Sequence, residues 1–342
     1  MTTTILICDD SSLARKQMAR ALPPGLADNI LFATTGEEGL EAIRQGNVDL
    51  LFLDLNMPGL DGYQVLQHIQ QEDLPVLTIV VSGDIQPEAR ERVRKLGAID
   101  FIKKPTDPAH VAELLEEYGF YRPSELEKSA NADAWLNDDA TQKPSISVSL
   151  NDYLQEISNV AMGRSSDLLA RLLKVFVKQP IPNVAFIATS ELSMAISAAE
   201  REQEYSAVCQ GFTGSGLAGE ALLLFEDASF REMAELLHYD VLEGESVNVE
   251  VLMDMSSILF GAFLNGISDQ LNIKLGLAHP TVLGQHRPIG ELLEHHRKRE
   301  EQLLAIEISY AIENRDIHCD MLILFTEESI PFLQKQLKYL VD

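Results

Sequence analysis

Residues 50–62 read LLFLDLNMPGLDG, a short apolar run that ends at Asp54 and is followed by a proline–glycine turn. Four similar runs, rich in β-branched and aromatic residues, surround this stretch: TILIC at 4–8, NILFA at 29–33, VLTIVVS at 76–82 and IDFIK at 99–103. Helical periods alternate with these runs over about 11–22, up to 45, over 87–96 and over 108–118. Five such repeats predict an α/β domain with one doubly wound parallel sheet and right-handed crossovers. Functional residues are then expected just after the strands, at their carboxyl ends.

The composition excludes several classes of protein. With 342 residues the chain is long enough for two domains, and 46% hydrophobic with 23% charged residues is typical of a globular protein. The formal net charge of −26, from 53 acidic and 27 basic residues, argues against nucleic acid or an anionic bilayer as a partner. We find no basic leader region and no apolar run near ~18 residues, so we expect a cytoplasmic protein without membrane insertion.

Cysteine usage agrees with a reducing compartment. Cys8, Cys209 and Cys319 lie far apart and show no C-x-x-C spacing, so neither a disulfide framework nor a zinc knuckle is indicated. Cys8 falls inside the first predicted strand and is interpreted as a small core residue.

The pattern divides the chain into a domain at 1–120, a linker at 121–148 and a second domain at 149–342. The linker is rich in Ser, Asn, Asp and Ala and has almost no apolar period. Trp135 is the exception within it, and a lone linker tryptophan is more typical of docking on a nearby surface than of ligand binding.

The second domain contains an internal duplication, with halves at about 149–243 and 244–342. Helical stretches at about 150–179 and 246–271 are each followed by an extended run that starts near Pro182 or Pro280. Later, ALLLFEDASFREMAELLHY and MLILFTEESIPFLQKQLKY repeat the same strand and helix at an offset close to one hundred residues. Adjacent strands joined by tight turns favour an α+β domain, with a pseudo-twofold duplicated antiparallel sheet and helices packed against it.

Chemistry-bearing residues follow four of the five strands of the first domain. Asp9 and Asp10 follow the first strand, Asp54 ends the third, Ser82 ends the fourth and Lys104, before Pro105, follows the fifth. Any one of these alone is typical of ordinary strand-end solvation, but five at the right strand ends predict phosphoryl transfer to a carboxylate. Clustered acids repel one another unless a divalent cation such as Mg²⁺ sits among them. Asp54 is the expected nucleophile, with Lys104 and Ser82 placed to bind the phosphoryl oxygens.

Residues 1–120 resemble the receiver domain of two-component response regulators, a flavodoxin-like fold. The resemblance implies that Asp54 is phosphorylated by a histidine kinase and that Ser82 is the switch hydroxyl. It further implies that Lys104 precedes a cis proline, and that Phe101, otherwise a plain core aromatic, is the aromatic that reports phosphorylation. The implied Mg²⁺ ligands are Asp9, Asp10, Asp54 and the backbone of Asn56.

A second constellation lies at the start of the second domain. Asp152, Glu156 and Asn159 stand four and three residues apart, which places them on one face of a helix, with Ile157, Val160 and Ala161 on the other side. Such a stripe is usually the solvent face of an amphipathic helix. Here, however, Pro182 follows Asn159 after twenty-two residues, which completes the pattern D-x₃-E-x₂-N-x₂₂-P.

This pattern resembles the signature of the CheC/CheX/FliY phosphatases, which dephosphorylate chemotaxis receiver domains of the CheY type. By that resemblance Asn159 holds the attacking water in line with phosphorus, since a carboxamide both donates and accepts hydrogen bonds. Glu156 pairs with the lysine of the target receiver. Asp152 and Pro182 are interpreted as structural, one at the start of the helix and one at the entry to a strand.

The second half keeps the spacing of the pattern but not its chemistry. Glu250, Asp254 and Ser257 occupy the matching positions, and Pro280 again follows after twenty-two residues. Asp254 is one methylene shorter than glutamate and Ser257 has no amide, so we expect one working site and one degenerate site.

Two other motifs are given structural interpretations. Gly214, Gly216 and Gly219 satisfy G-x-G-x-x-G, but a strand rather than a helix follows, so we predict a glycine-rich β-turn and no dinucleotide site. The basic run at 295–299 could dock an acidic partner, although such runs are more often solvated helix ends.

These observations leave a second functional hypothesis open. The duplicated domain could be a non-catalytic binding module, switched by phosphorylation, for a flagellar motor component or another receiver. A third interpretation, in which the two halves make a homodimer surface, is compatible with either function. A linker of some 25 residues spans about 25–30 Å if flexible, so action on the chain's own receiver is sterically conceivable, although we favour action in trans.

Overall fold

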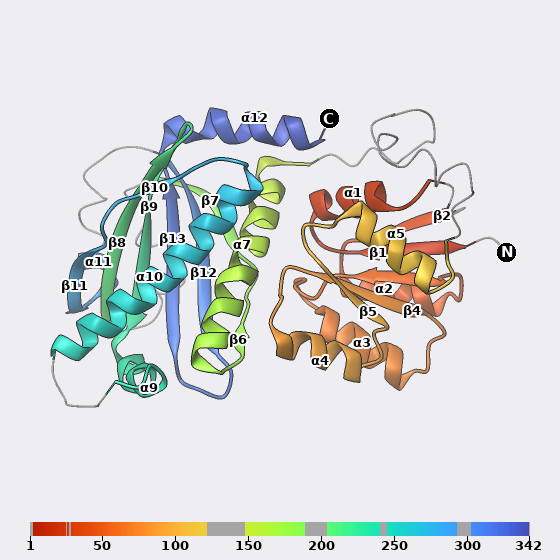
Figure 1. The fold of residues 1–342 in the computed structure, drawn as a ribbon, viewed down its shortest axis with the longest axis horizontal. Helices are drawn as coiled ribbons and strands as arrows, with labels where there is room; N and C mark the ends of the chain where they lie inside the picture. Colours follow the sequence, from red (N-terminus) through yellow and green to blue (C-terminus); the bar gives the residue numbers. More distant parts are fainter. Residues whose placement is uncertain are drawn as a thin grey trace. The chain divides into compact units, whose positions relative to one another are not determined.

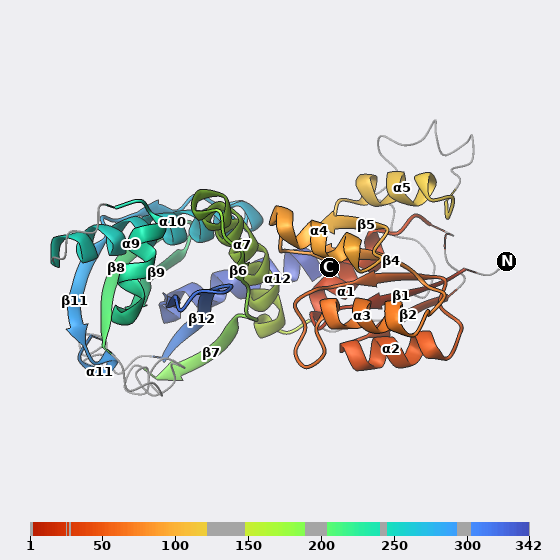
Figure 2. The same ribbon diagram turned by 90° about the horizontal axis from the view of Figure 1, so that it is seen from below.

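The computed structural model describes residues 3–24, 26, 29–121, 148–188, 204–239, 245–292 and 302–341 (Figures 1 and 2). The chain divides into two compact units, one built on a five-stranded sheet and one on an eight-stranded sheet. The predicted linker segment 122–147, with Trp135, and the basic run at 295–299 lie outside the described residues.

The N-terminal unit is a doubly wound parallel sheet, as the alternation of apolar runs and helical periods predicts. Its strands are β1 (Thr4–Cys8), β2 (Asn29–Ala33), β3 (Leu50–Leu53), β4 (Leu77–Ser82) and β5 (Asp100–Lys103). Its helices are α1 (Ser12–Ala21), α2 (Gly36–Arg44), α3 (Gly62–Gln71), α4 (Pro87–Lys95) and α5 (Pro108–Glu117). The strands run in the order β2-β1-β3-β4-β5, and every neighbouring pair is parallel.

Apolar side chains fill both faces of this sheet because successive residues of a strand point to opposite sides. Ile5 and Ile7 of β1 pack in the cluster that includes α1 and α5, whereas Leu6 and Cys8 pack in the cluster that includes α2 and α3. Figure 1 shows α1 above the strands of this sheet and α3 and α4 below them. A sheet covered in this way leaves its carboxyl edge as the place where polar side chains can gather.

Glycine at position 62 allows the loop after β3 to turn closely over the sheet. A Cβ atom at Gly62 would lie 2.2 Å from the carbonyl oxygen of Asp54, a distance that no side chain tolerates. Asp61 then starts α3 with a capping box, in which its side chain accepts from the N–H of Gln64 and the Gln64 side chain accepts from the N–H of Asp61. The loop that carries Asp54 is therefore held at both ends.

The second unit is an antiparallel sheet with helices, and the order of its elements repeats. The first series is α7 (Leu150–Leu173), β6 (Val177–Lys178), β7 (Asn183–Ala188), β8 (Tyr205–Gly214), β9 (Leu217–Glu226), η3 (Asp227–Ser229) and α9 (Phe230–Leu236). The second series is α10 (Glu245–Gln270), β10 (Gly276–Leu277), β11 (Thr281–Arg287), α11 (Ile289–Leu292), β12 (Gln302–Ile312), β13 (His318–Phe325), η5 (Glu327–Ser329) and α12 (Ile330–Val341).

Strand pairing in this unit is symmetric about its centre. The path runs β10-β8-β9-β13-β12-β6, with β11 also paired to β8 and β7 also paired to β12. At the middle, Leu222 of β9 lies opposite Leu322 of β13, which is its own counterpart in the hundred-residue repeat. The short strands of each half therefore pair with the other half. Strands β6 and β7 pair with β12, and β10 and β11 pair with β8. The duplicated halves form one sheet with a local pseudo-twofold axis.

The two long helices α7 and α10 pack against each other, and both lie across one face of the sheet in Figure 1. Their close approach needs a small residue, because a Cβ at Gly266 would lie 2.9 Å from Ala161. The sequence-based limit of the first long helix was wrong. This helix ends at Leu173 rather than near 179, because Lys174 adopts a left-handed φ of 55° and β6 begins at Val177.

Segment Val247–Gln270 of α10 is the one span within the described residues that is long and apolar enough to cross a membrane. Composition alone does not separate such a span from the core helix of a globular domain. In this structure Leu259, Phe260 and Phe263 of α10 are fully buried, and the helix packs on α7, α9 and β8.

The glycine-rich motif forms a β-turn, as predicted. It joins β8 to β9 with Ser215 and Gly216 in the loop, and both residues have positive φ, of 53° and 91°. The turn is followed by strand β9, which begins at Leu217, and not by the helix that a dinucleotide-binding motif requires.

Candidate functional site

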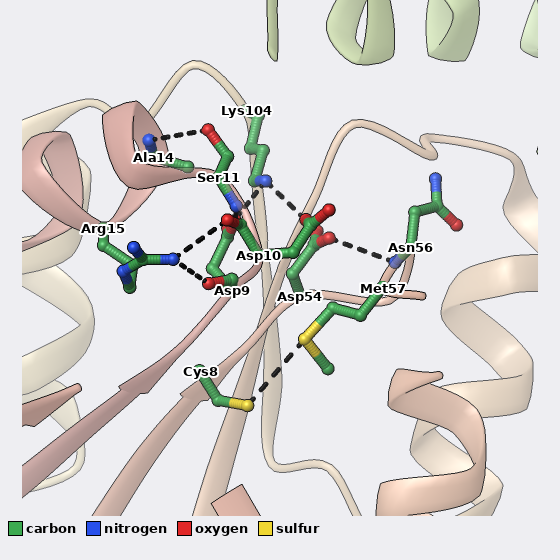
Figure 3. Close-up of polar contacts among 10 residues, drawn as sticks. All are labelled: Cys8, Asp9, Asp10, Ser11, Ala14, Arg15, Asp54, Asn56, Met57 and Lys104. Carbon is green, nitrogen blue, oxygen red and sulfur yellow. Dashed lines mark hydrogen bonds and ion pairs between the residues drawn. The ribbon is translucent and has the colours of Figure 1, made fainter. Parts of the chain in front are cut away.

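The acidic residues predicted to act together meet at the carboxyl edge of the parallel sheet (Figure 3). The carboxylates of Asp9, Asp10 and Asp54 offer oxygen atoms that all lie within 4.8 Å of one another. Lys104 reaches between two of them, with its Nζ 2.7 Å from Asp9 Oδ2 and 3.2 Å from Asp54 Oδ1. Four ionisable side chains that directly follow three different strands are thus brought into one cluster.

Sheet topology accounts for this meeting. Strand β1 lies between β2 and β3, and β3 lies beside β4, so the ends of β1 and β3 are neighbours at the same edge. The N–H of Asp54 donates to the carbonyl of Cys8 at 2.9 Å, which fixes the start of the loop that carries Asp54. On the far side, the N–H of Lys104 donates to the carbonyl of Ser82 at 2.9 Å, and the Lys104–Pro105 bond is cis, as the family resemblance implies.

Local hydrogen bonds orient the carboxylates. Asp9 Oδ1 accepts from the N–H of Ser11 at 2.8 Å, and Asp54 Oδ2 accepts from the N–H of Asn56 at 3.1 Å. These donors leave Asp9 Oδ2 and Asp54 Oδ1 facing Lys104. Asp9, Asp54 and Lys104 are at most 4% exposed, and a charged group held this far from water interacts strongly with its neighbours.

Sequence reasoning missed one residue of this site, Arg15. Its guanidinium donates to the backbone carbonyls of Asp9, at 2.5 Å, and of Asp10, at 3.0 Å. Arg15 therefore binds the backbone of the loop that follows β1 rather than a carboxylate side chain. A basic residue five positions after an acidic pair carries no recognisable signal in the sequence, because its direction depends on the start of α1.

The negative field of the cluster reaches Cys8, whose thiol donates to the carbonyl of Thr35 and contacts the sulfur of Met57. Burial, followed by the carboxylates of Asp9 and Asp54, raises the pKa of Cys8 far above its usual range. Cys8 is fully buried and remains a neutral thiol, in agreement with its interpretation as a core residue.

The donor set suits Mg²⁺. Three carboxylates in one place offer only hard oxygen ligands, which is the preference of Mg²⁺, and their mutual repulsion is relieved by a divalent cation. Zinc, which prefers nitrogen and sulfur ligands, is less well matched. Receiver domains bind Mg²⁺ in such an acidic pocket, and this buried cluster is compatible with that.

The two predicted switch residues flank the cluster on neighbouring strands. Ser82 ends β4 with a fully buried side chain, and Phe101 lies on β5, which pairs with β4. Phe101 is partly buried against the apolar cluster that covers the α2 and α3 face. The switching roles of both residues stay predictions.

The second predicted site lies on α7. At 100° per residue, Asp152, Glu156 and Asn159 fall within about 60° of one another around the helix axis. The opposite side of α7 carries Ala161, which approaches α10, and Ser165, whose hydroxyl is 2.8 Å from that of Tyr310 on β12. The stripe therefore lies on the side of α7 opposite to the contacts with α10 and β12. Glu156 and Asn159 are nevertheless only 4% exposed each, so the stripe is not a solvent face, and its catalytic role stays a prediction.

The matching stripe on α10 is engaged by hydrogen bonds within the same unit. Asp254 accepts from the hydroxyl of Tyr239 at 2.7 Å, and the Ser257 hydroxyl donates to the carbonyl of Met253 at 2.8 Å. The hydrogen bond to Asp254 raises the pKa of Tyr239 to about 12. Both side chains of this stripe are exposed, yet their polar atoms already have partners.

Comparison with known proteins divides the chain in the same way. Residues 5–116 match the family of response regulator receiver domains. A protein-glutamate methylesterase/protein-glutamine glutaminase of Geobacter sulfurreducens is 37% identical over 103 residues, which are 30% of this chain and 28% of that protein. A probable C4-dicarboxylate response regulator, DctR of Bacillus subtilis, is 38% identical over 90 residues, which are 26% of this chain and 40% of that protein.

Among solved structures, FliY of Thermotoga maritima covers 56% of this chain and 96% of its own, at 16% identity and a TM-score of 0.41. A similarity this distant carries no argument about activity. The chain spans less than half the length of the curated relatives named above, so their activities are not transferred to it.

The family match and the site geometry agree for the N-terminal unit. Residues 5–116 form a response regulator receiver domain, a signalling module with the CheY-like fold. The acidic cluster of Asp9, Asp10 and Asp54 with Lys104 lies within these matched residues.

Proposed function

We propose that this chain is a response regulator that is phosphorylated on Asp54 and whose second unit hydrolyses the aspartyl phosphate of a CheY-type receiver. The phosphatase part rests on one observation above all. The stripe of Glu156 and Asn159 completes the D-x₃-E-x₂-N-x₂₂-P pattern on the side of α7 opposite to its contacts with α10 and β12, while its counterpart on α10 carries Asp254 and Ser257 instead.

In the receiver, the groups around Asp54 suit an in-line transfer of phosphate from a histidine kinase. One oxygen of the Asp54 carboxylate attacks phosphorus, and the bond from phosphorus to the donor nitrogen breaks. Lys104, 3.2 Å from Asp54 Oδ1, is placed to neutralise the charge on the transferred group. Asp9 and Asp10, with the Asn56 carbonyl, would hold Mg²⁺, which supplies further positive charge to the phosphoryl oxygens.

In the second unit, Asn159 supplies what an aspartyl phosphate lacks. A receiver pocket already has a lysine and a site for Mg²⁺, so a docked phosphatase needs only to orient water. The Asn159 amide would accept a hydrogen bond from the water and hold its oxygen in line with phosphorus. The water oxygen would form the new bond to phosphorus as the bond from phosphorus to the target aspartate breaks, which releases the carboxylate and inorganic phosphate. Glu156, one turn away on the same face, would pair with the lysine of the target and set the register of α7.

The degenerate stripe on α10 fits a single working site. Ser257 has no amide, and its hydroxyl donates a hydrogen bond to the backbone carbonyl of Met253. Asp254 accepts a hydrogen bond from the hydroxyl of Tyr239. With one active half, the partners that we expect are a histidine kinase and a phosphorylated CheY-type receiver in the cytoplasm.

Two experiments test the proposal. For the receiver, incubation with a small phosphodonor and Mg²⁺ should label the wild-type protein once per chain and leave Asp54→Asn unlabelled. For the phosphatase, the lifetime of a separately phosphorylated chemotaxis receiver is measured with this protein in an Asp54→Asn background, where phosphotransfer between chains is impossible.

Substitutions of Glu156 and Asn159 should change different kinetic parameters. Glu156→Gln should raise the concentration of receiver needed for half-maximal rate, because it removes a docking charge, whereas Asn159→Ala should lower the maximal rate. If the second unit binds the receiver but never shortens its phosphate lifetime, the alternative function holds, which is a non-catalytic module that binds a signalling or motor partner.

A further inference from the structure

We propose that Glu204, Asp227 and His286 form a second metal site, suited to Zn²⁺, on the antiparallel sheet of the second unit. One ligand atom from each side chain lies within 4.8 Å of the other two. Among the described residues only this group and the receiver pocket bring three such ligands together. The site is independent of the phosphatase stripe and of the receiver pocket, and nothing in the proposed function uses it.

Strand register brings these three residues together. Tyr205 pairs with Glu226, so Glu204 and Asp227 are the next pair outward, and the N–H of Asp227 donates to the carbonyl of Glu204 at 3.1 Å. On the other side of β8, Arg287 of β11 pairs with Tyr205. His286 therefore stands at the same level of the sheet as Glu204 and Asp227, on the third of three adjacent strands.

The backbone of β11 departs from regular pairing at this point. The register of β11 with β8 shifts between Gly284 and Arg287, and His286 adopts a left-handed φ of 53°. As a result the imidazole reaches across β8, and its Nδ1 lies 2.6 Å from Asp227 Oδ2. Asp227 is also fixed from behind, because the hydroxyl of Ser206, a fully buried residue, donates to Asp227 Oδ1 at 2.8 Å. Outer hydrogen bonds of this kind orient the ligands of metal sites.

The donor set distinguishes this site from the receiver pocket. One imidazole nitrogen with two carboxylates is a typical set for Zn²⁺, with water as the fourth ligand, whereas Mg²⁺ favours oxygen alone. The imidazole would bind the ion through a ring nitrogen in its neutral form. The ion would join the ends of β8, β9 and β11, and so fix the edge strand β11 to the sheet.

The internal repeat provides a comparison within the chain. The counterparts of Glu204, Asp227 and His286 in the other half are Gln302, Glu327 and Ala188. That half thus has no imidazole and one carboxylate fewer, so the three-ligand set belongs to one side of the duplicated sheet. His318 forms a simple ion pair with Asp316 at 3.4 Å, without a third ligand among the described residues, and therefore serves as a matched control.

The test is a Zn²⁺ titration of the full-length protein by equilibrium dialysis, with Mg²⁺ in large excess to occupy the receiver pocket. Wild type and His318→Ala should bind one Zn²⁺ per chain with the same affinity. His286→Ala and Glu204→Gln should bind roughly 100-fold more weakly or worse, since loss of an outer partner alone costs about 10–100-fold. Glu204 is exposed, so its variant is expected to fold normally, and circular dichroism checks both variants.

Three results would overturn the proposal. One is the absence of stoichiometric Zn²⁺ binding by the wild-type protein. Another is unchanged affinity in both His286→Ala and Glu204→Gln. The third is loss of binding in a His295→Ala/His296→Ala variant, which would assign the ion to the basic run outside the described residues. Phosphate lifetime is not part of this test, so failure of the zinc site leaves the proposed function untouched.

Discussion

Substitution of Asp10 by asparagine should stabilise the receiver domain without Mg²⁺ and remove its response to Mg²⁺. Asp10 lies within 4.8 Å of both other carboxylates of the cluster. At that separation, with an effective dielectric constant near 20, each repulsion is worth roughly 3 kcal/mol. Asparagine removes two such repulsions and one attraction to Lys104 of similar size. The net gain in folding free energy is then about that of one repulsion. Because Asp10 is partly exposed, we reduce this to a gain of about 2 kcal/mol.

Magnesium should cancel that gain. An ion at 100 times its dissociation constant stabilises the folded state by about 2.7 kcal/mol, and the wild-type cluster with three carboxylates receives this in full. The variant has lost one ligand and receives less. At saturating Mg²⁺ the wild type should therefore be at least as stable as Asp10→Asn.

Hydrogen exchange measured by mass spectrometry suits this prediction because it reports the receiver separately from the second unit. Peptides that span β1 and β3 should exchange more slowly in Asp10→Asn than in wild type without Mg²⁺, by about 2 kcal/mol of opening free energy. Asp73→Asn, at an exposed position outside the cluster, makes the same change of net charge. This variant should neither slow exchange without Mg²⁺ nor lose the response to Mg²⁺. Destabilisation of metal-free Asp10→Asn, or equal stabilisation of both proteins by Mg²⁺, would refute the reasoning.

Three further predictions concern packing and titration. Gly266→Ala should destabilise the second unit by about 1–3 kcal/mol in denaturant unfolding, because its Cβ would lie 2.9 Å from Ala161. Gly261→Ala, on the same helix with no atom within 4 Å of its Cβ, should instead stabilise by about 0.5–1 kcal/mol. Tyr239 should ionise near pH 12 by phenolate absorbance and at a lower pH in Asp254→Asn, which removes the largest cause of the raised pKa. Because its pKa is raised in the folded state, its stabilising effect should persist below pH 10 and disappear as the pH rises to about 12. All three cysteine thiols have pKa values raised chiefly by burial, so a thiol reagent at pH 8 should modify them much more slowly in the folded than in the unfolded protein.

Much of the receiver could be predicted from the sequence, because its information is local. Four of the five strands end at or directly before a predicted site residue, as β3 does before Asp54, and parallel topology brings the ends of β1 and β3 together. The direction of the Arg15 side chain was not predictable in this way. It depends on α1 starting at Ser12, which turns the guanidinium beneath the loop and onto the backbone of Asp9.

In the second unit the sequence pattern predicted the repeat and the antiparallel sheet but not the exchange of short strands between the halves. Pairing of β11 with β8 is a long-range contact, and no local signal specifies it. The hydrogen bond from Tyr239 to Asp254 was missed for the same reason, because α9 and α10 meet only after the halves assemble. The end of α7 was misplaced because the left-handed turn at Lys174 lacks the usual glycine.

The most direct test of the account compares Asn159→Ala with Ser257→Ala in the phosphate decay of a separate, fully phosphorylated CheY-type receiver. Both substitutions truncate a polar side chain at the same position of the repeated stripe, one on each half. We predict that wild type and Ser257→Ala accelerate the decay equally and that Asn159→Ala leaves it at the spontaneous rate. Acceleration that survives in Asn159→Ala, or is lost in Ser257→Ala, would contradict the assignment of one working phosphatase site to α7.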